Sequence, residues 1–164
     1  TYMVLRTRNL GEIQVNEDAI ICVPDGILGF EDLKHYIFVE VEEFYPFMWL
    51  LSVEDPEIGF AVSDPHYFFG APYEVMLSDV DRSVLDLRTG DDISVFVIVS
   101  IADGARRITA NLKGPIVLNT RNRLAKQVVV YSPSYSVRQS PLTLLPEHLP
   151  AAAMIEGSRA AARG

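Results

Sequence analysis

Carboxylates crowd one short stretch of the chain, residues 52–69, which reads SVEDPEIGFAVSDPHYFF. Two Asp-Pro steps begin at Asp55 and Asp64, and Glu54 and Glu57 stand beside the first of them. Acids at this density can belong to a glycosidase active site, a calcium loop, a pair of turns or an acidic docking surface. Each of these arrangements needs different neighbours, so the surrounding residue types decide between them.

An active site is the least supported of these interpretations. A glycosidase needs two acids roughly 5–10 Å apart in a cleft, with the pKa of one raised by burial. Each acid here stands beside a proline or another acid in an expected loop, where water keeps its pKa ordinary. Asp-Pro is itself a turn former, because the Asp side chain bonds a following amide while the proline fixes φ. The pattern favours turns and a solvated rim, and a carbohydrate-active barrel enzyme that uses two loop acids stays as the alternative.

Other residues that could do chemistry are sparse. Histidines 35, 66 and 148 show neither HxH nor HxxxH spacing, and the DxDxDG alternation of a calcium loop is missing. Neither a GxSxG nucleophile motif nor a glycine-rich phosphate loop is present. The lone cysteine, Cys22, lies in an apolar run and is interpreted as a buried side chain. We therefore predict a protein that is not an enzyme and holds neither a metal ion nor a cofactor.

Aromatic residues directly follow the second Asp-Pro step. Burial in a core accounts for at least half of them in one interpretation; in another, partly exposed rings surrounded by acids form a docking hot spot. A third interpretation, a stacking platform for nucleic acid, needs a basic groove, whereas the neighbouring residues are acids. The candidate protein-binding residues are Glu54, Asp55, Glu57, Asp64, Tyr67, Phe68 and Phe69.

Composition limits the class of protein further. The 164 residues suffice for one domain, and 49% hydrophobic with 22% charged residues is an ordinary globular balance. No apolar run approaches the ~18 residues of a membrane helix, and no secretion-signal pattern opens the chain. With a single cysteine, these features predict the cytoplasm. The net charge of −8 opposes non-specific phosphate binding and favours basic partners.

The elements that must position these residues are short. β-Branched and aromatic runs separated by Gly, Pro, Asn and Asp indicate strands near 2–8, 12–15, 19–23, 36–41, 47–52, 59–62, 73–77, 93–101, 107–112, 115–119 and 126–131. Many short strands with almost no helix predict an all-β fold, a small antiparallel β-barrel or sandwich in a single domain. The segments 47–52 and 93–101 are apolar on both faces. We expect 93–101 at the centre of the core, and 47–52 either buried or forming part of a contact surface.

One segment carries a helix pattern, and one end of the chain carries no strand pattern. Ser78 is the expected N-cap of a short helix near 79–87, with acids in its first turn. Residues 1–140 are predicted to form the domain. Residues 141–164, rich in proline and alanine, are predicted to form a flexible tail.

Six short motifs stand in a characteristic order and spacing. They are PDGILGFE at 24–31, FMWLLSVEDP at 47–56, DP at 64–65, TANL at 109–112, GPIVLNT at 114–120 and KQVV at 126–129. With these motifs the chain resembles the FliW family of flagellar assembly factors over roughly residues 3–140.

The resemblance implies a small β-barrel-like protein without catalytic activity. FliW proteins bind the RNA-binding translational regulator CsrA, act on it allosterically and relieve its repression of flagellin synthesis. They also bind flagellin, so that free flagellin competes for FliW and returns CsrA to its repressive state. The resemblance thus implies CsrA and flagellin as partners, with no direct nucleic acid and no membrane. Because CsrA is basic, the net charge of −8 agrees with this expectation.

Overall fold

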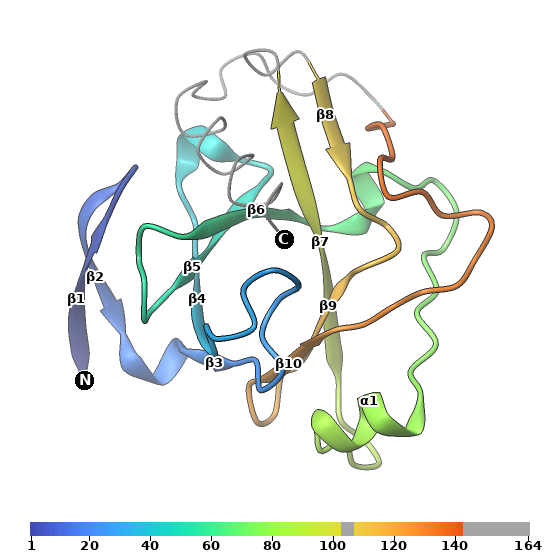
Figure 1. Cartoon of the computed structure of the whole chain (residues 1–164), viewed down its shortest axis with the longest axis horizontal. Coiled ribbons are helices and arrows are strands. Elements are labelled where there is room, and N and C mark those ends of the chain that lie inside the picture. Colours follow the sequence, from blue (N-terminus) through green and yellow to red (C-terminus); the bar gives the residue numbers. More distant parts are fainter. Residues whose placement is uncertain (103–106, 143–164) are drawn as a thin grey trace.

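Regular structure in the computed structural model, which describes residues 1–102 and 107–142, is almost entirely β-sheet (Figure 1). Strands β1 (Tyr2–Thr7) and β2 (Gly11–Asn16) form a separate antiparallel hairpin. The other sheet contains β3 (Ile21–Cys22), β4 (His35–Val39), β5 (Met48–Ser52), β6 (Gly59–Ser63), β7 (Ile93–Ala102), β8 (Arg107–Ala110), β9 (Ile116–Asn119) and β10 (Leu124–Gln127). Three 3₁₀ turns, η1 (Glu17–Ala19), η2 (Glu42–Phe44) and η3 (Pro65–Tyr67), and one helix, α1 (Asp79–Val84), complete the described elements.

The large sheet closes on itself. Its strand order is β6-β5-β4-β3-β10-β9-β7-β8, and β6 pairs additionally with β7. The long strand β7 makes this possible, because it pairs with β9 along Ile93–Phe96 and with β6 along Val97–Val99. All pairings are antiparallel except that of β3 with β10. The prediction of an all-β, barrel-like fold is confirmed, with one parallel pair inside it.

Side chains alternate between two apolar clusters, one on each face of the curved sheet. The inner cluster receives a residue from every strand of the ring, including Leu50 of β5 and Ile98 of β7. The outer cluster holds their neighbours, including Trp49 and Val97. The prediction of burial on both faces is therefore confirmed for 47–52 and for Val97–Val99, whereas Ile93 is 40% exposed and residues 94–96 are half-buried.

The loop between β3 and β4 closes one mouth of the ring, where Figure 1 shows it in blue at the centre. Ile27 is fully buried in the inner cluster, and the ring of Phe30 meets that of Phe60 edge-on at 5.3 Å. Gly26 has φ +69°, and a Cβ there would lie 2.6 Å from the Cα of Glu31. Only glycine therefore fits this turn without moving the backbone opposite.

Helix α1 is shorter than predicted but begins where predicted. Ser78 Oγ accepts from the N–H of Asp81, and the Asp81 carboxylate accepts from the N–H of Ser78, which forms a capping box. The helix ends at Val84 rather than 87, because Asp86 has φ +46° and the N–H of Leu87 turns back to the carbonyl of Arg82. The Nδ2 groups of Asn119 and Asn122 both donate to the carbonyl of Leu85 just beyond this end.

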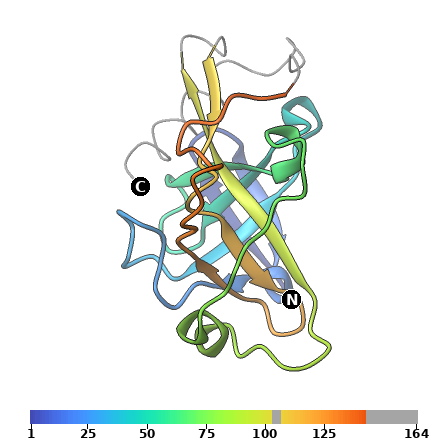
Figure 2. The same ribbon diagram turned by 90° about the vertical axis from the view of Figure 1, so that its right-hand side faces the viewer.

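Segment 73–77, predicted as a strand, is not one. Val75 and Leu77 pack against the outer cluster while Glu74 and Met76 are exposed, so the alternation that suggested a strand is real. The segment lacks a partner strand, since the N–H of Glu74 donates to the side-chain oxygen of Tyr135 instead. Figure 2 shows this part of the chain leading to α1 as an irregular segment.

The predicted strand at 126–131 ends at Gln127. Val128 still donates to the carbonyl of Pro115, but proline has no N–H to return the bond, and the regular ladder stops there. The predicted tail 141–164 lies outside the described residues except for 141 and 142. Within the described part, no helix combines the length and apolarity needed to cross a membrane.

Candidate protein-interaction site

The two Asp-Pro turns lie at opposite ends of β6 (Gly59–Ser63) and do not form one cluster. Five residues of strand span about 13 Å between their first and last Cα atoms. Asp55 and Glu57 therefore belong to the turn that enters β6, whereas Asp64 belongs to the turn that leaves it. The seven candidate residues divide into two separate surfaces.

Turn chemistry accounts for the acids of the first surface. Asp55 Oδ1 accepts from the N–H of Glu57 at 3.3 Å, and the Asp55 N–H donates to Ser52 Oγ at 3.0 Å. The carbonyl of Asp55 closes the turn by accepting from the N–H of Ile58. Asp55 thus shapes the β5–β6 connection, and Glu57 projects from it as an exposed carboxylate.

Glu54 ties this connection to β4. Its carboxylate accepts from the N–H groups of Lys34 and His35, each at 3.0 Å, and lies 2.9 Å from His35 Nδ1. Burial alone would raise the pKa of Glu54, but the hydrogen bonds from His35 and Lys34 outweigh it and lower the pKa. A low pKa keeps Glu54 ionised, which is the opposite of what a general acid needs.

Asp64 has the same turn-forming role on the second surface. It is the N-cap of η3, where its Oδ1 accepts from the N–H of His66 at 2.9 Å and lies 2.6 Å from His66 Nδ1. Pro65 occupies the first position of the turn, where a missing N–H does no harm. Asp64 and His66 remain exposed.

The three consecutive aromatic residues have three different environments. Phe68 is fully buried and stacks on Phe47 at 6.2 Å, so it is a core residue and not a surface anchor as proposed from the sequence. Phe69 is half-buried, with its ring edge-on to that of Tyr135 at 5.0 Å. Tyr67 is partly buried, and its hydroxyl lies within hydrogen-bonding distance of another side chain at the surface.

That side chain is Tyr45, which the sequence analysis did not select. The two hydroxyl oxygens lie 3.4 Å apart, and Tyr45 is 65% exposed. The hydrogen bond with Tyr45 raises the pKa of the Tyr67 hydroxyl. The signal in the sequence was the pattern EEFYPF at 42–47, in which a tyrosine stands between residues typical of a core and next to two acids.

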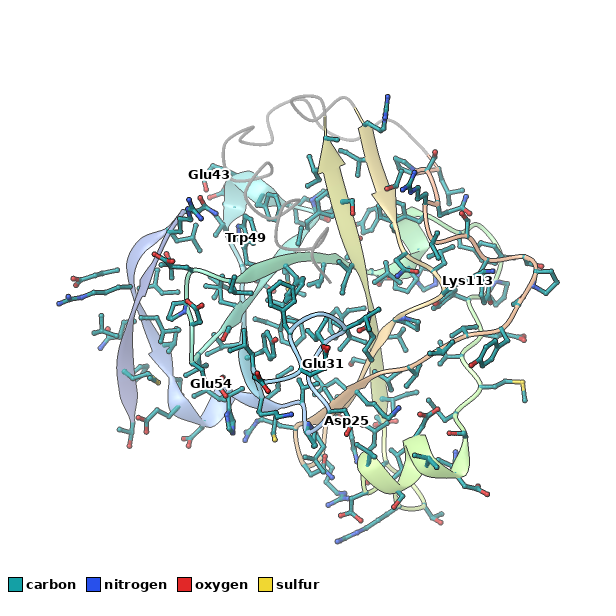
Figure 3. All side chains as sticks on the ribbon, viewed as in Figure 1. Asp25, Glu31, Glu43, Trp49, Glu54 and Lys113 are labelled. Carbon is teal, nitrogen blue, oxygen red and sulfur yellow. The ribbon has the colours of Figure 1, made fainter. Side chains whose placement is uncertain are left out.

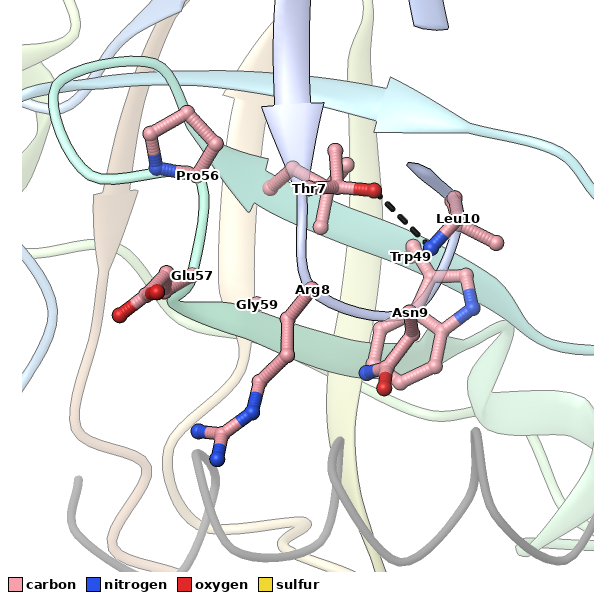
Figure 4. A pocket seen from close by; sticks show the side chains of 9 residues that line it. Thr7, Arg8, Asn9, Leu10, Trp49, Pro56, Glu57 and Gly59 are labelled. Carbon is pink, nitrogen blue, oxygen red and sulfur yellow. Dashed lines mark hydrogen bonds between the residues drawn. The ribbon is translucent and has the colours of Figure 1, made fainter. Parts of the chain in front are cut away.

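A pocket in the described part of the chain lacks the pair of acids that a glycosidase requires. This pocket lies between the β1–β2 turn and strands β5 and β6 (Figure 4). It is lined by Thr7, Arg8, Asn9, Leu10, Trp49, Leu51, Pro56, Glu57 and Gly59. Glu57 is the single carboxylate in that lining, whereas the reaction needs a pair. Figure 3 shows Glu43 and Glu54 on opposite sides of Trp49, so these acids do not converge.

Metal and nucleic-acid binding also lack the necessary side chains in the described part of the chain. Across residues 1–102 and 107–142, no three His, Cys, Asp or Glu side chains gather as metal ligands would. Tyr67 follows Asp64, and its hydroxyl partner Tyr45 follows Glu42 and Glu43 of η2. These residues are exposed acids, whereas a nucleic acid requires a basic groove. What the geometry offers is an exposed, acidic surface with a few aromatic rings.

Comparison with known proteins gives a consistent result over the same region. The family FliW protein matches residues 4–142. A protein of Alkaliphilus metalliredigens named flagellar assembly factor FliW is 36% identical over 137 residues, which cover 83% of this chain and 84% of that protein. A protein of Geobacter sulfurreducens with the same name is 38% identical, with coverage of 83% and 84%. A crystal structure of the flagellar assembly factor FliW matches with a TM-score of 0.77 at 32% identity, covering 88% of this chain and 99% of that chain.

Proposed function

Because the chain belongs to the FliW family of flagellar assembly factors, we propose that it is a non-enzymatic binding protein with two partners. It binds the translational regulator CsrA and antagonises it allosterically, which relieves repression of flagellin translation. It also binds flagellin, acting as its chaperone, and flagellin displaces CsrA. Both events take place in the cytoplasm.

The observation that carries this proposal is the extent of the family match. It spans residues 4–142, which include every described strand from β2 to β10. The motifs that suggested the family are also structural parts of this barrel: residues 24–31 close its mouth and residues 47–56 supply β5 and the first Asp-Pro turn. The chain also covers 99% of the solved FliW structure that it matches, and we expect it to share the activity of that family.

Charge supports the first partner. The net charge of −8 creates a field that attracts a basic protein and speeds its association. Several of the acids are exposed, among them Glu42, Glu43 and Asp64. A basic regulator such as CsrA is the type of protein that this surface would recruit.

A carbohydrate-active enzyme remains the alternative, and no observation favours it. The pocket described above has one carboxylate in its lining, and Glu54 has a lowered pKa. A retaining or inverting mechanism would require a second acid with a raised pKa in the same cleft.

The experiment that tests the proposal uses purified full-length chain, CsrA, flagellin and a labelled flagellin leader RNA. We expect a complex with CsrA at micromolar concentrations, and we expect the chain to lower the affinity of CsrA for the RNA. Added flagellin should restore RNA binding by removing the chain from CsrA. If the chain forms a complex with neither CsrA nor flagellin, the proposal is contradicted.

A further inference from the structure

Two tyrosines from different turns, Tyr45 exposed and Tyr67 partly buried, meet on the surface beside η2 and η3. Tyr45 directly follows η2 (Glu42–Phe44) and Tyr67 ends η3 (Pro65–Tyr67). Their hydroxyl oxygens lie 3.4 Å apart, and the ring of Tyr45 is 65% exposed. We call these two residues the tyrosine pair.

Buried rings fix the position of the tyrosine pair. Tyr45 is flanked in the sequence by Phe44 and Phe47, which are 1% and 2% exposed, and Tyr67 is followed by Phe68, which is fully buried. Phe47 and Phe68 stack on each other with ring centroids 6.2 Å apart, which joins the two turns through the core. The backbone at both tyrosines is therefore anchored by buried neighbours, and anchored aromatic residues are typical of hot spots.

Carboxylates stand shortly before each member of the tyrosine pair in the sequence. Glu42 and Glu43 form the first turn of η2, and Asp64 is the N-cap of η3. All three are exposed, and residues 40–47 contain three acids with no lysine or arginine. His66, which lies 2.6 Å from Asp64, is the basic side chain nearest in sequence to this group.

We propose that the tyrosine pair and the acids Glu42 and Glu43 form the docking surface for a basic protein segment. Arginine and lysine side chains bind this combination well, because a cation is attracted to the face of a tyrosine ring and pairs with a carboxylate beside it. Hot spots are enriched in tyrosine and in its arginine partners. This inference rests on the proposed function, in which the basic partner is CsrA rather than flagellin.

The first test replaces each ring in the full chain and measures binding to CsrA and to flagellin. We expect Tyr45→Ala and Tyr67→Ala each to weaken CsrA binding about tenfold or more. Tyr45→Phe should keep most of the affinity, because it keeps the ring. The matched control is Tyr2→Ala, because Tyr2 is also 65% exposed but lies on the β1–β2 hairpin.

The second test separates the acids of η2 from acidity in general. The chain contains another 3₁₀ turn with two acids in its first turn, η1, with Glu17 and Asp18. The variant Glu42→Gln/Glu43→Gln should bind CsrA more weakly than wild type and with a smaller dependence on salt. The control Glu17→Gln/Asp18→Asn makes the same change in net charge and should leave both quantities close to wild type.

These outcomes distinguish this inference from the proposed function. If the wild type binds neither CsrA nor flagellin, the proposed function fails and the docking surface with it. If the wild type binds CsrA and the Tyr45 and Tyr67 variants bind it equally well, the proposed function stands and this inference is overturned. Loss of flagellin binding, alone or together with CsrA binding, would also overturn the assignment of this surface to the basic partner. Circular dichroism and a melting curve establish that each variant is folded.

Discussion

Lys126 Nζ lies 2.8 Å from Asp81 Oδ1, so an ion pair joins strand β10 to helix α1. The same carboxylate closes the capping box of the helix by accepting from the N–H of Ser78. Burial would raise the pKa of Asp81, but the hydrogen bonds from Lys126 and Ser78 lower it. One side chain thus both starts α1 and attaches it to the barrel.

Replacement of Asp81 by alanine should destabilise the protein by about 2–3 kcal/mol. The change removes a helix cap and leaves Lys126 without its partner in a largely buried position. Asp79→Ala, in the same first turn but exposed, is the control and should change the stability by about 0.5 kcal/mol or less. The measurement is the free energy of unfolding by urea, and equal effects of the two substitutions would contradict the role given to Asp81.

Stability should also fall at low pH through Asp91. Hydrogen bonds from the Arg121 guanidinium and the Arg88 N–H lower the pKa of Asp91 from 3.8 to about 2. The folded state therefore prefers the ionised form, so the contribution of Asp91 is complete above pH ~4, decreases between pH ~4 and ~2, and is absent below that.

Melting curves of wild type and Asp91→Asn over this pH range check that prediction. The wild type should be the more stable protein at pH 7, and the difference between the two should shrink as the pH is lowered from 4 to 2. A difference that stays constant over the whole range would show that the Asp91 carboxylate has the same pKa in the folded and unfolded states.

Phe68 should behave as a core residue and not as a contact residue. Phe68→Ala removes a fully buried ring stacked on Phe47, and it should destabilise the protein by about 3–5 kcal/mol. Tyr45→Ala, which removes a side chain that is 65% exposed, should change the stability by about 0.5 kcal/mol or less. The free energy of unfolding is measured by chemical denaturation. Comparable losses of stability in the two variants would contradict the assignment of Phe68 to the core and Tyr45 to the surface.

Alanine substitutions at two glycines with positive φ can distinguish the cost of backbone strain from the cost of a steric clash. Gly11 has φ +66° and open space around its Cβ position, whereas Gly26 has φ +69° and the backbone of Glu31 at 2.6 Å. Alanine in the left-handed region costs about 1–2 kcal/mol at either site. Gly26→Ala should destabilise by at least about 1 kcal/mol more than Gly11→Ala, because the mouth-closing loop must also move. Equal losses in the free energy of unfolding, measured with urea, would show that the mouth-closing loop moves at no energetic cost.

Local chemistry in the sequence predicted what depends on neighbours along the chain. Ser78 as a helix cap and Asp55 and Asp64 as turn formers all require partners within three residues, and the structure shows those hydrogen bonds. Burial on both faces of Val97–Val99 followed from the continuous apolar composition of 93–101. Closure of the ring by β6 and β7, and the parallel pairing of β3 with β10, join segments distant in sequence and have no local signal.

The candidate site was predicted less completely for the same reason. The run Tyr67-Phe68-Phe69 contains three aromatic residues, and its composition does not show which ring enters the core. Stacking of Phe47 on Phe68 decides this, and it leaves Tyr67 to meet Tyr45. Tyr45 was missed because its hydroxyl contact is with Tyr67, a residue 22 positions away in the sequence.

The most direct test of the central claim is the affinity of CsrA for a flagellin leader RNA, measured with and without this chain. The account predicts that a stoichiometric amount of the chain weakens RNA binding while remaining bound to CsrA, and that added flagellin reverses the effect. RNA affinity that does not change while a complex of the chain with CsrA is present would contradict the account.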